Sequence, residues 1–205
     1  MQKQRSEYLD LRRKFEPSGV RLVIVAESPP ESETGIKYFY NPDGKVSEPL
    51  FTALMKQLGI PKPKTKCEGL SEFQKRGWVL VDATYEQVNK HDEHHADCVI
   101  CRDYLELVSD LKRLLAACWS RVPLVLIKAN VCKLLEPKLK DSGFNVLNKG
   151  RIVYFPATGH QRDFDRQFRE IVPETLHGKG PNENLDRSAS NASNQRGTAE
   201  PPESE

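Results

Sequence analysis

Short apolar runs alternate with amphipathic segments along most of this chain. Four runs rich in β-branched or large apolar residues predict strands, at residues 20–26, 78–81, 122–127 and 152–155. The first run is the most continuous, and such a run is typical of a strand that is covered on both faces. We therefore expect a buried sheet whose core includes residues 20–26.

Amphipathic helical patterns follow these runs. One begins after Ser47, which we expect to cap the helix, and it places a row of leucines on one face. A second follows Asp103 as its cap, and a third is short and is expected to bend or end near Pro137. The last covers residues 161–170. The chain thus alternates predicted strands with predicted helices.

Strands that alternate with helices predict a parallel sheet with helices on both of its faces. The expected fold is a three-layer α/β/α sandwich around a short, mostly parallel four-stranded sheet, and it occupies residues 1–172. Residues 173–205 are rich in Asn, Ser, Gly, Pro and Glu and contain few large apolar residues. Such a segment buries too little apolar surface to offset the entropy of ordering, so we expect a disordered tail.

Composition and charge narrow the class of protein. Of the 205 residues, 38% are hydrophobic and 29% are charged, which is a globular balance. No apolar run approaches the roughly 18 residues that cross a bilayer, and residues 1–15 lack the apolar stretch of a signal peptide. We therefore expect a cytoplasmic monomer without a membrane partner, in which the five cysteines are free thiols or metal ligands.

The net charge is +2, but it is unevenly spread. The tail carries six acidic and three basic residues, so the body of the chain is mildly basic. This balance permits a polyanionic partner such as DNA without requiring one.

Polar residues follow each predicted strand. In parallel sheets, ligands bind outside the carboxyl ends of the strands, and these ends lead into residues 27–30, 82–85, 128–130 and 156–160. The first of them reads Glu27-Ser28-Pro29-Pro30. Because two prolines stiffen the loop, they fix where the carboxyl group of Glu27 points. We therefore expect the working site to lie at this loop.

This pattern resembles the uracil-DNA glycosylase superfamily. Several of its families carry a Gly-Glu-Ala-Pro-Gly loop after the first strand, and residues 26–30 read Ala-Glu-Ser-Pro-Pro at that place. The family then has a glycine followed by an aromatic residue that stacks on the flipped base, and residues 35–40 are similar. Asp82 stands at the end of the second strand, where the family has an asparagine, and Phe155 stands at the position of its catalytic histidine.

The resemblance implies a DNA glycosylase that hydrolyses the N-glycosidic bond of a flipped, damaged base. It implies that Glu27 positions water or stabilises the sugar cation, and that His160 replaces the missing histidine as donor to the leaving base. Asp82 would accept from an exocyclic amine, or hold a proton if burial raised its pKa. The base-binding residues implied by the resemblance are Ser28, Pro29, Tyr38, Phe39 and Asp82.

Each assignment has a structural alternative. Glu27 can cap a loop by accepting from backbone N–H groups, and the aromatic residues 38–40 can form a hydrophobic lid. Asp82 at a strand end can make a turn. His160 can cap the last helix or lie in solvent. A second function class therefore stays open, a non-catalytic member that binds nucleic acid or a nucleobase.

Two basic stretches suggest DNA contact. Arg162, Arg166 and Arg169 recur at helical spacing opposite apolar residues, which predicts a stripe that contacts phosphates. The alternative is a merely solvated face. Three lysines interleaved with prolines around residues 62–66 invite the same two interpretations.

A third function class rests on a cluster of metal-ligand types after the second strand. Its residues are His91, His94, His95, Cys98 and Cys101. Two cysteines at C-x-x-C spacing with two histidines are the ligands of a zinc site in a zinc-stabilised hydrolase or interaction module. All of them fall in one predicted loop, whereas zinc motifs usually place the second pair farther away, so we expect no metal there. The superfamily's iron–sulfur cluster needs an N-terminal cysteine pair, and because no cysteine precedes Cys67, no cofactor is expected.

Overall fold

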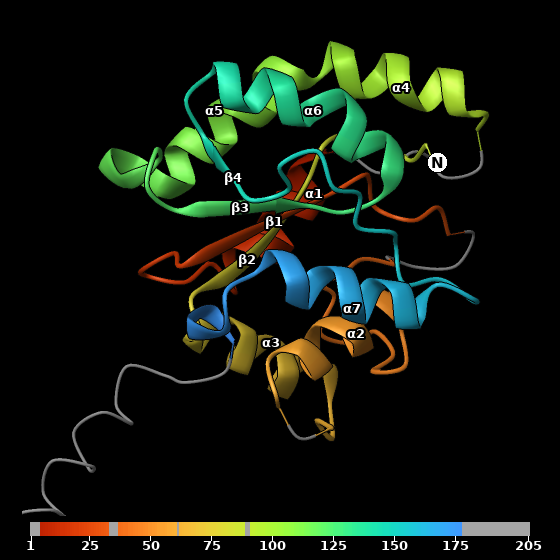
Figure 1. Cartoon of the computed structure of the whole chain (residues 1–205). Coiled ribbons are helices and arrows are strands. Elements are labelled where there is room, and N and C mark those ends of the chain that lie inside the picture. The colour runs from red at the N-terminus through yellow and green to blue at the C-terminus, as the bar shows by residue number, and fades with distance from the viewer. Residues whose placement is uncertain (1–4, 33–36, 61, 89–90, 178–205) are drawn as a thin grey trace, which may run out of the picture.

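The protein is a three-layer α/β/α sandwich, as the sequence predicts (Figure 1). The computed structural model describes residues 5–32, 37–60, 62–88 and 91–177. A four-stranded sheet has the order β2-β1-β3-β4, and every neighbouring pair is parallel. The strands are β1 (Leu22–Ala26), β2 (Trp78–Asp82), β3 (Pro123–Leu126) and β4 (Asn145–Val146). Among the residues described, no helix is long and apolar enough to cross a membrane.

Helices cover both faces of the sheet (Figure 1). One layer contains α4 (Glu93–Arg102), α5 (Tyr104–Leu115) and α6 (Ala129–Asp141). The opposite layer contains α2 (Pro49–Gln57), α3 (Lys66–Lys75) and α7 (Gln161–Ile171). The N-terminal helix α1 (Arg5–Arg13) places Tyr8 in the core of that second layer. Two short 3₁₀ turns complete the elements, at Ala116–Cys118 and Glu174–Leu176.

The interior position of strand β1 in the sheet explains why its sequence is apolar at every position. Successive side chains of a strand point to opposite faces of the sheet. Leu22 and Ile24 accordingly pack in the core beneath α2 and α7, whereas Val23 and Val25 pack in the core beneath α5 and α6. All five residues of the strand are buried. A central parallel strand between two helical layers therefore needs no polar face.

The fourth strand was wrongly predicted. The edge of β3 pairs with Asn145 and Val146, and residues 152–155 form no ladder with the sheet. Individual hydrogen bonds hold that later segment instead. The carbonyl of Val153 accepts from Lys128 N at 2.7 Å, and Tyr154 N donates to the side chain of Gln167. Only Val153 of the run is fully buried, so its apolar sequence reflects one anchoring residue rather than a ladder.

Three expected helix signals also differ from the structure. Glu48 rather than Ser47 occupies the cap position of α2, without a side-chain cap bond, and Pro49 opens the helix. The carboxylate of Asp103 does not cap α5, because it accepts from Thr84 and Arg102 instead. Helix α6 continues through Pro137 to its end at Asp141, with the proline on an exposed position.

Helix α3 was not predicted from the sequence. Its start separates the three lysines that the sequence suggested as one basic stretch. Thr65 caps the helix by accepting from Glu68 N. Lys62 and Lys64 are exposed, but Lys66 is buried, and its ammonium donates to Glu48 Oε2 at 2.6 Å and to the carbonyl of Tyr38 at 2.8 Å. These lysines therefore do not form one basic surface.

The packed chain extends past the predicted boundary at residue 172. Trp78 Nε1 donates to the carbonyl of Leu176 at 3.1 Å. The two ring nitrogens of His177 lie 3.0 Å from the carbonyls of Gln57 and Val172. Residues 173–177 are therefore part of the folded body, and the rest of the predicted tail, residues 178–205, lies outside the described residues.

Candidate ligand-binding site

A cavity of about 340 Å³ opens at the carboxyl ends of β1 and β2. Parallel sheets bind ligands at this edge, where the loops that follow the strands meet. His160 does not line the cavity, but the other six of the seven residues that the sequence assigned as catalytic or base-binding do. These six are Glu27, Ser28, Pro29, Tyr38, Phe39 and Asp82.

Glu27 is buried and lines the cavity, and two side chains hold its carboxylate. Lys128 forms an ion pair with one oxygen, and Asn130 Nδ2 donates to the other at 2.8 Å. Asn130 Nδ2 also lies 3.2 Å from Asp97 Oδ1 on α4. A buried carboxylate is tolerated when charge-assisted hydrogen bonds replace its lost hydration, so these partners explain how Glu27 is held in place.

Lys128 and Asn130 are functional candidates that the sequence did not identify. Both lie after β3, among polar strand-end residues that were noted without a role. The backbone of Lys128 has φ 81°, a left-handed conformation that L side chains rarely adopt. Such strain persists where the surrounding structure enforces it, often at functional sites. Here the strained residue links the end of β3 to α6 and brings its ammonium to Glu27.

Asp82 is the second carboxyl group of the cavity. Its burial raises the pKa to about 7, the nearby charge of Arg12 opposes the rise, and the charge of Glu27 adds to it. Its Oδ2 atom is buried and has no hydrogen-bond partner among the described residues. A carboxyl group in this state can donate a hydrogen bond when protonated and accept one when ionised.

Tyr38 and Phe39 form the aromatic wall of the cavity. They are 1% and 6% exposed and pack into the core, with the Phe39 ring 5.1 Å from that of Phe73 and the Tyr38 ring 4.9 Å from that of Tyr8. Both aromatic side chains therefore contact the core as well as the cavity. Of the motif that contains them, residues 35 and 36 lie outside the described residues.

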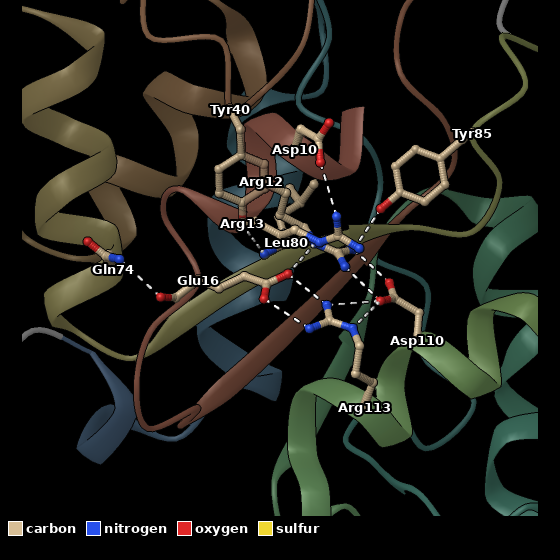
Figure 2. A network of polar contacts seen from close by, with 10 residues as sticks. All are labelled: Asp10, Arg12, Arg13, Glu16, Tyr40, Gln74, Leu80, Tyr85, Asp110 and Arg113. Atoms are coloured by element: carbon tan, nitrogen blue, oxygen red, sulfur yellow. Dashed lines mark hydrogen bonds and ion pairs between the residues drawn. The ribbon is translucent and has the colours of Figure 1, made fainter. Parts of the chain in front are cut away.

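A buried arginine on α1, Arg12, lies in a polar network with Tyr85 and Asp110 (Figure 2). Arg12 on α1 donates to both carboxylate oxygens of Asp110 at 2.7 Å and to the hydroxyl of Tyr85 at 2.6 Å. Burial alone would raise the pKa of Asp110, but the hydrogen bond and charge of Arg12 hold it below the usual value. The Tyr85 ring stacks on Tyr8, which in turn packs edge-on against Tyr38. Helix α1 is thus connected to the cavity wall through aromatic contacts.

His160 lies away from this cavity. It occupies the cap position of α7 without a side-chain cap bond, and its side chain is 53% exposed. Its ring stacks against Tyr154, and its Nδ1 atom lies 3.5 Å from Asp163 Oδ2. The cavity is lined by Phe155 instead. The resemblance required His160 to lie in the same site as Glu27, and the structure does not place it there.

The three arginines of α7 project from its exposed side. Arg166 pairs with Asp163 and Glu170 on the same helix, and Arg169 Nε donates to Gln57 Oε1 at 3.1 Å. Two of the three are thus engaged within the protein. Their contact with DNA, and that of Arg162, stays a prediction.

The histidines and cysteines that suggested zinc lie on a helix rather than in a loop. Asp92 caps α4, which carries His94, Cys98 and Cys101 on exposed positions. His91 precedes the helix, and its ring lies 4.5 Å from that of His95. Within the described ranges, no three His, Cys, Asp or Glu side chains gather closely enough to hold a metal ion.

Comparison with known proteins adds no identification. No family model matches the chain, and no curated protein or solved structure matches it either. What the cavity does must therefore be inferred from its own residues.

Proposed function

We propose that this cavity binds a nucleobase and that the protein hydrolyses its N-glycosidic bond. One observation carries the proposal: two carboxyl groups at the ends of adjacent strands line one cavity in different surroundings. Glu27 is the anionic partner of an ion pair, whereas burial raises the pKa of Asp82 to about 7. Two carboxyl groups whose environments separate their protonation are the usual acid and base of glycoside hydrolysis.

Glu27 takes the role of the anion. Cleavage of an N-glycosidic bond develops positive charge on the sugar, and a fixed carboxylate stabilises that charge or orients the attacking water. Lys128 and Asn130 hold this carboxylate in a single orientation. Preorganisation of this kind lowers the barrier because no reorganisation is needed during the reaction.

Asp82 takes the role that the resemblance assigned to His160. The departing base carries negative charge, and a protonated carboxyl group donates a hydrogen bond or a proton to it. A pKa of about 7 keeps the protonated form populated near neutral pH. Its Oδ2 atom has no hydrogen-bond partner among the described residues, so its hydrogen-bonding capacity is unused. The aromatic rings of Tyr38 and Phe39 supply the wall against which a planar base packs.

A second candidate is a protein that binds the base without cleaving the bond. It is favoured by one observation: both oxygens of Glu27 already accept from side chains. A water molecule that Glu27 activates would have to share one of these oxygens. Binding requires no such rearrangement, since stacking and the edge contact with Asp82 suffice.

The test is cleavage of oligonucleotides that contain a single uracil, hypoxanthine or xanthine, followed by alkali treatment. The wild-type protein is expected to break at least one of them at the modified base. Glu27→Gln and Asp82→Asn are each expected to lower the rate by about 10²–10⁴-fold, the usual contribution of a positioned acid or base. His160→Ala is the matched control and should keep the wild-type rate, because His160 lies outside the cavity.

The outcomes separate the two candidates. Equal cleavage by wild type and Glu27→Gln would remove Glu27 from the reaction. Intact oligonucleotides that are nevertheless retarded in gels, with retardation weakened by Asp82→Asn, would establish binding without cleavage. Intact oligonucleotides without retardation would reject both candidates for these bases.

A further inference from the structure

Two thiols on the exposed side of α4 each contact a basic side chain. Cys98 Sγ lies 3.8 Å from His94 Nε2, one turn earlier on the helix. Cys101 Sγ accepts from Lys138 Nζ, which reaches across from α6 at 3.4 Å. The Lys138 ammonium also lies 5.5 Å from the ring centre of Tyr104, so it is held between this ring and the sulfur.

The other cysteines lack such surroundings. Cys67 and Cys118 are exposed, and across the described ranges their sulfur atoms make no polar contact. Cys132 is buried, and this burial raises the pKa of its thiol to about 11, which makes it unreactive. The chain therefore contains its own reference thiols for the pair on α4.

We propose that Cys98 and Cys101 form a redox-active dithiol, with Cys101 as the nucleophile and Cys98 as the resolving thiol. We infer a peroxide as the oxidant, because both thiols are exposed and a thiolate reduces a peroxide directly, giving a sulfenic acid that a neighbouring thiol resolves. This site is independent of the cavity, because neither cysteine lines it. In the described part of the chain, no three His, Cys, Asp or Glu side chains gather closely enough there to hold a metal ion.

Lys138 makes Cys101 the nucleophile. The attacking species of a cysteine is its thiolate, which is favoured beside an ammonium group. Cys101 lies in the last turn of α4, where the carbonyl ends of the helix oppose negative charge. The only cation contacting the sulfur in the described structure is Lys138, since the nearby Arg102 is bound to Glu86 and Asp103. Lys138 therefore decides whether this thiol is more reactive than its neighbours.

The reaction consumes one peroxide and forms one disulfide. The Cys101 thiolate attacks a peroxide oxygen, the O–O bond breaks, and the leaving oxygen takes a proton to become water, or an alcohol from an organic peroxide. The sulfur becomes a sulfenic acid. The Cys98 thiol then attacks this sulfur, the S–O bond breaks with loss of water, and an S–S bond forms. Two thiols are oxidised, and the peroxide is reduced.

A disulfide between Cys98 and Cys101 requires one turn of α4 to change its geometry. Residues three apart on a helix have Cβ atoms about 5–6 Å apart, whereas a disulfide requires about 3.5–4.5 Å. The turn must therefore tighten or unwind when the bond forms. Because α4 ends at Arg102, the distortion is limited to its last turn.

The first test is alkylation of the reduced full chain with limiting iodoacetamide, read for each cysteine by peptide mass spectrometry. Cys101 is expected to react about tenfold faster than Cys67 and Cys118, the effect of one charge-assisted hydrogen bond. Lys138→Gln should bring Cys101 to the rate of Cys118, and Lys138→Arg should preserve the faster rate. Equal rates for Cys101 and Cys118 in the wild type would overturn the role of Lys138.

The second test is treatment of the reduced chain with hydrogen peroxide. An intramolecular Cys98–Cys101 disulfide that dithiothreitol reverses is expected. In Cys98→Ser, an exposed substitution, dimedone should trap a sulfenic acid on Cys101, and the Cys67→Ser control should still form the disulfide. Oxidation that instead links two chains through Cys67 or Cys118, or that carries Cys101 to sulfinic acid with Cys98 reduced, would reject the proposal.

Discussion

Glu27 and Asp82 stand at the carboxyl ends of neighbouring parallel strands and line one cavity. Asp82 on β2 is the register partner of Ala26 on β1, and Glu27 is the next residue after Ala26. The backbone N–H of Thr84 donates to the carbonyl of Glu27 at 3.0 Å, which continues the pairing past the strands. The backbone pairing of the sheet therefore places both residues at the same edge.

The raised pKa of Asp82 makes stability depend on pH. The pKa is 3.8 in the unfolded chain and about 7 in the folded protein, so between these values the folded state keeps a proton that the unfolded state releases. The contribution of protonated Asp82 to the free energy of unfolding is therefore fully present below pH 3.8 and is lost as the pH rises to about 7. The expected loss is roughly 4 kcal/mol, from 1.36 kcal/mol per pKa unit.

Urea unfolding of wild type and Asp82→Asn at several pH values measures this loss. The difference in unfolding free energy between the two proteins should change by most of that amount between about pH 4 and about pH 8. Asp163→Asn is the control, because the Asp163 side chain is 44% exposed. A difference that stays constant with pH would show that Asp82 is ionised throughout.

Arg12 is expected to be among the most sensitive positions for stability. Arg12→Met leaves the buried carboxylate of Asp110 without its main partner, and breaking a buried ion pair costs about 3–5 kcal/mol. Arg13→Met is a matched control on the same helix, since Arg13 is exposed and pairs with Asp10 for about 0–1 kcal/mol (Figure 2). Urea unfolding should separate the two variants clearly.

The double variant Arg12→Met/Asp110→Leu tests the cause. Removing both charges eliminates the uncompensated carboxylate, so the double variant should be more stable than Arg12→Met alone. If it is equally or less stable, the packing of the Arg12 side chain rather than its charge is what the protein loses.

The sequence predicted the fold well where packing leaves a periodic signal. Strands β1, β2 and β3 and helix α7 appear close to their predicted residues, because each buries a continuous run or a regular stripe. The sequence did not predict the fourth strand, which is defined by its pairing with β3 rather than by an apolar pattern. Asn145 and Val146 are too few to show alternation, and they become a strand only because the turn after α6 delivers them to the edge of β3.

The site was predicted in part for a similar reason. Glu27 and Asp82 could be found because each ends an apolar run, and the ends of parallel strands meet at one edge. Lys128 and Asn130 could not be assigned, since their role depends on a left-handed backbone turn that sequence periodicity does not show. His160 was misplaced because a short distance along the chain from Phe155 was taken for closeness in space.

Tyr40 protects the free edge of the sheet. Strand β2 is an edge strand, and the Tyr40 hydroxyl accepts from Leu80 N at 2.7 Å and donates to the Leu80 carbonyl at 3.2 Å (Figure 2). Tyr40→Phe leaves these two buried backbone groups without a partner and should cost about 1–3 kcal/mol. Tyr154→Phe, at a tyrosine that is 38% exposed, should cost less than about 0.5 kcal/mol in the same unfolding measurement.

The strained backbone of Lys128 gives a prediction with an unusual sign. At φ 81°, glycine fits without strain, whereas any residue with a Cβ atom does not. Lys128→Gly and Lys128→Ala both remove the ion pair with Glu27, so the difference between them isolates the backbone. Lys128→Gly should be the more stable of the two by about 1 kcal/mol in urea unfolding.

The matched pair at Lys133 should show the reverse order. Lys133 is exposed within α6, where the backbone is helical, and there glycine is less favourable than alanine by about 1 kcal/mol. Opposite signs at the two lysines would establish that the chain maintains a strained residue beside Glu27. The same sign at both would mean that the turn at residue 128 relaxes once its side chain is shortened, and the ion pair with Glu27 would then be what holds the turn in place.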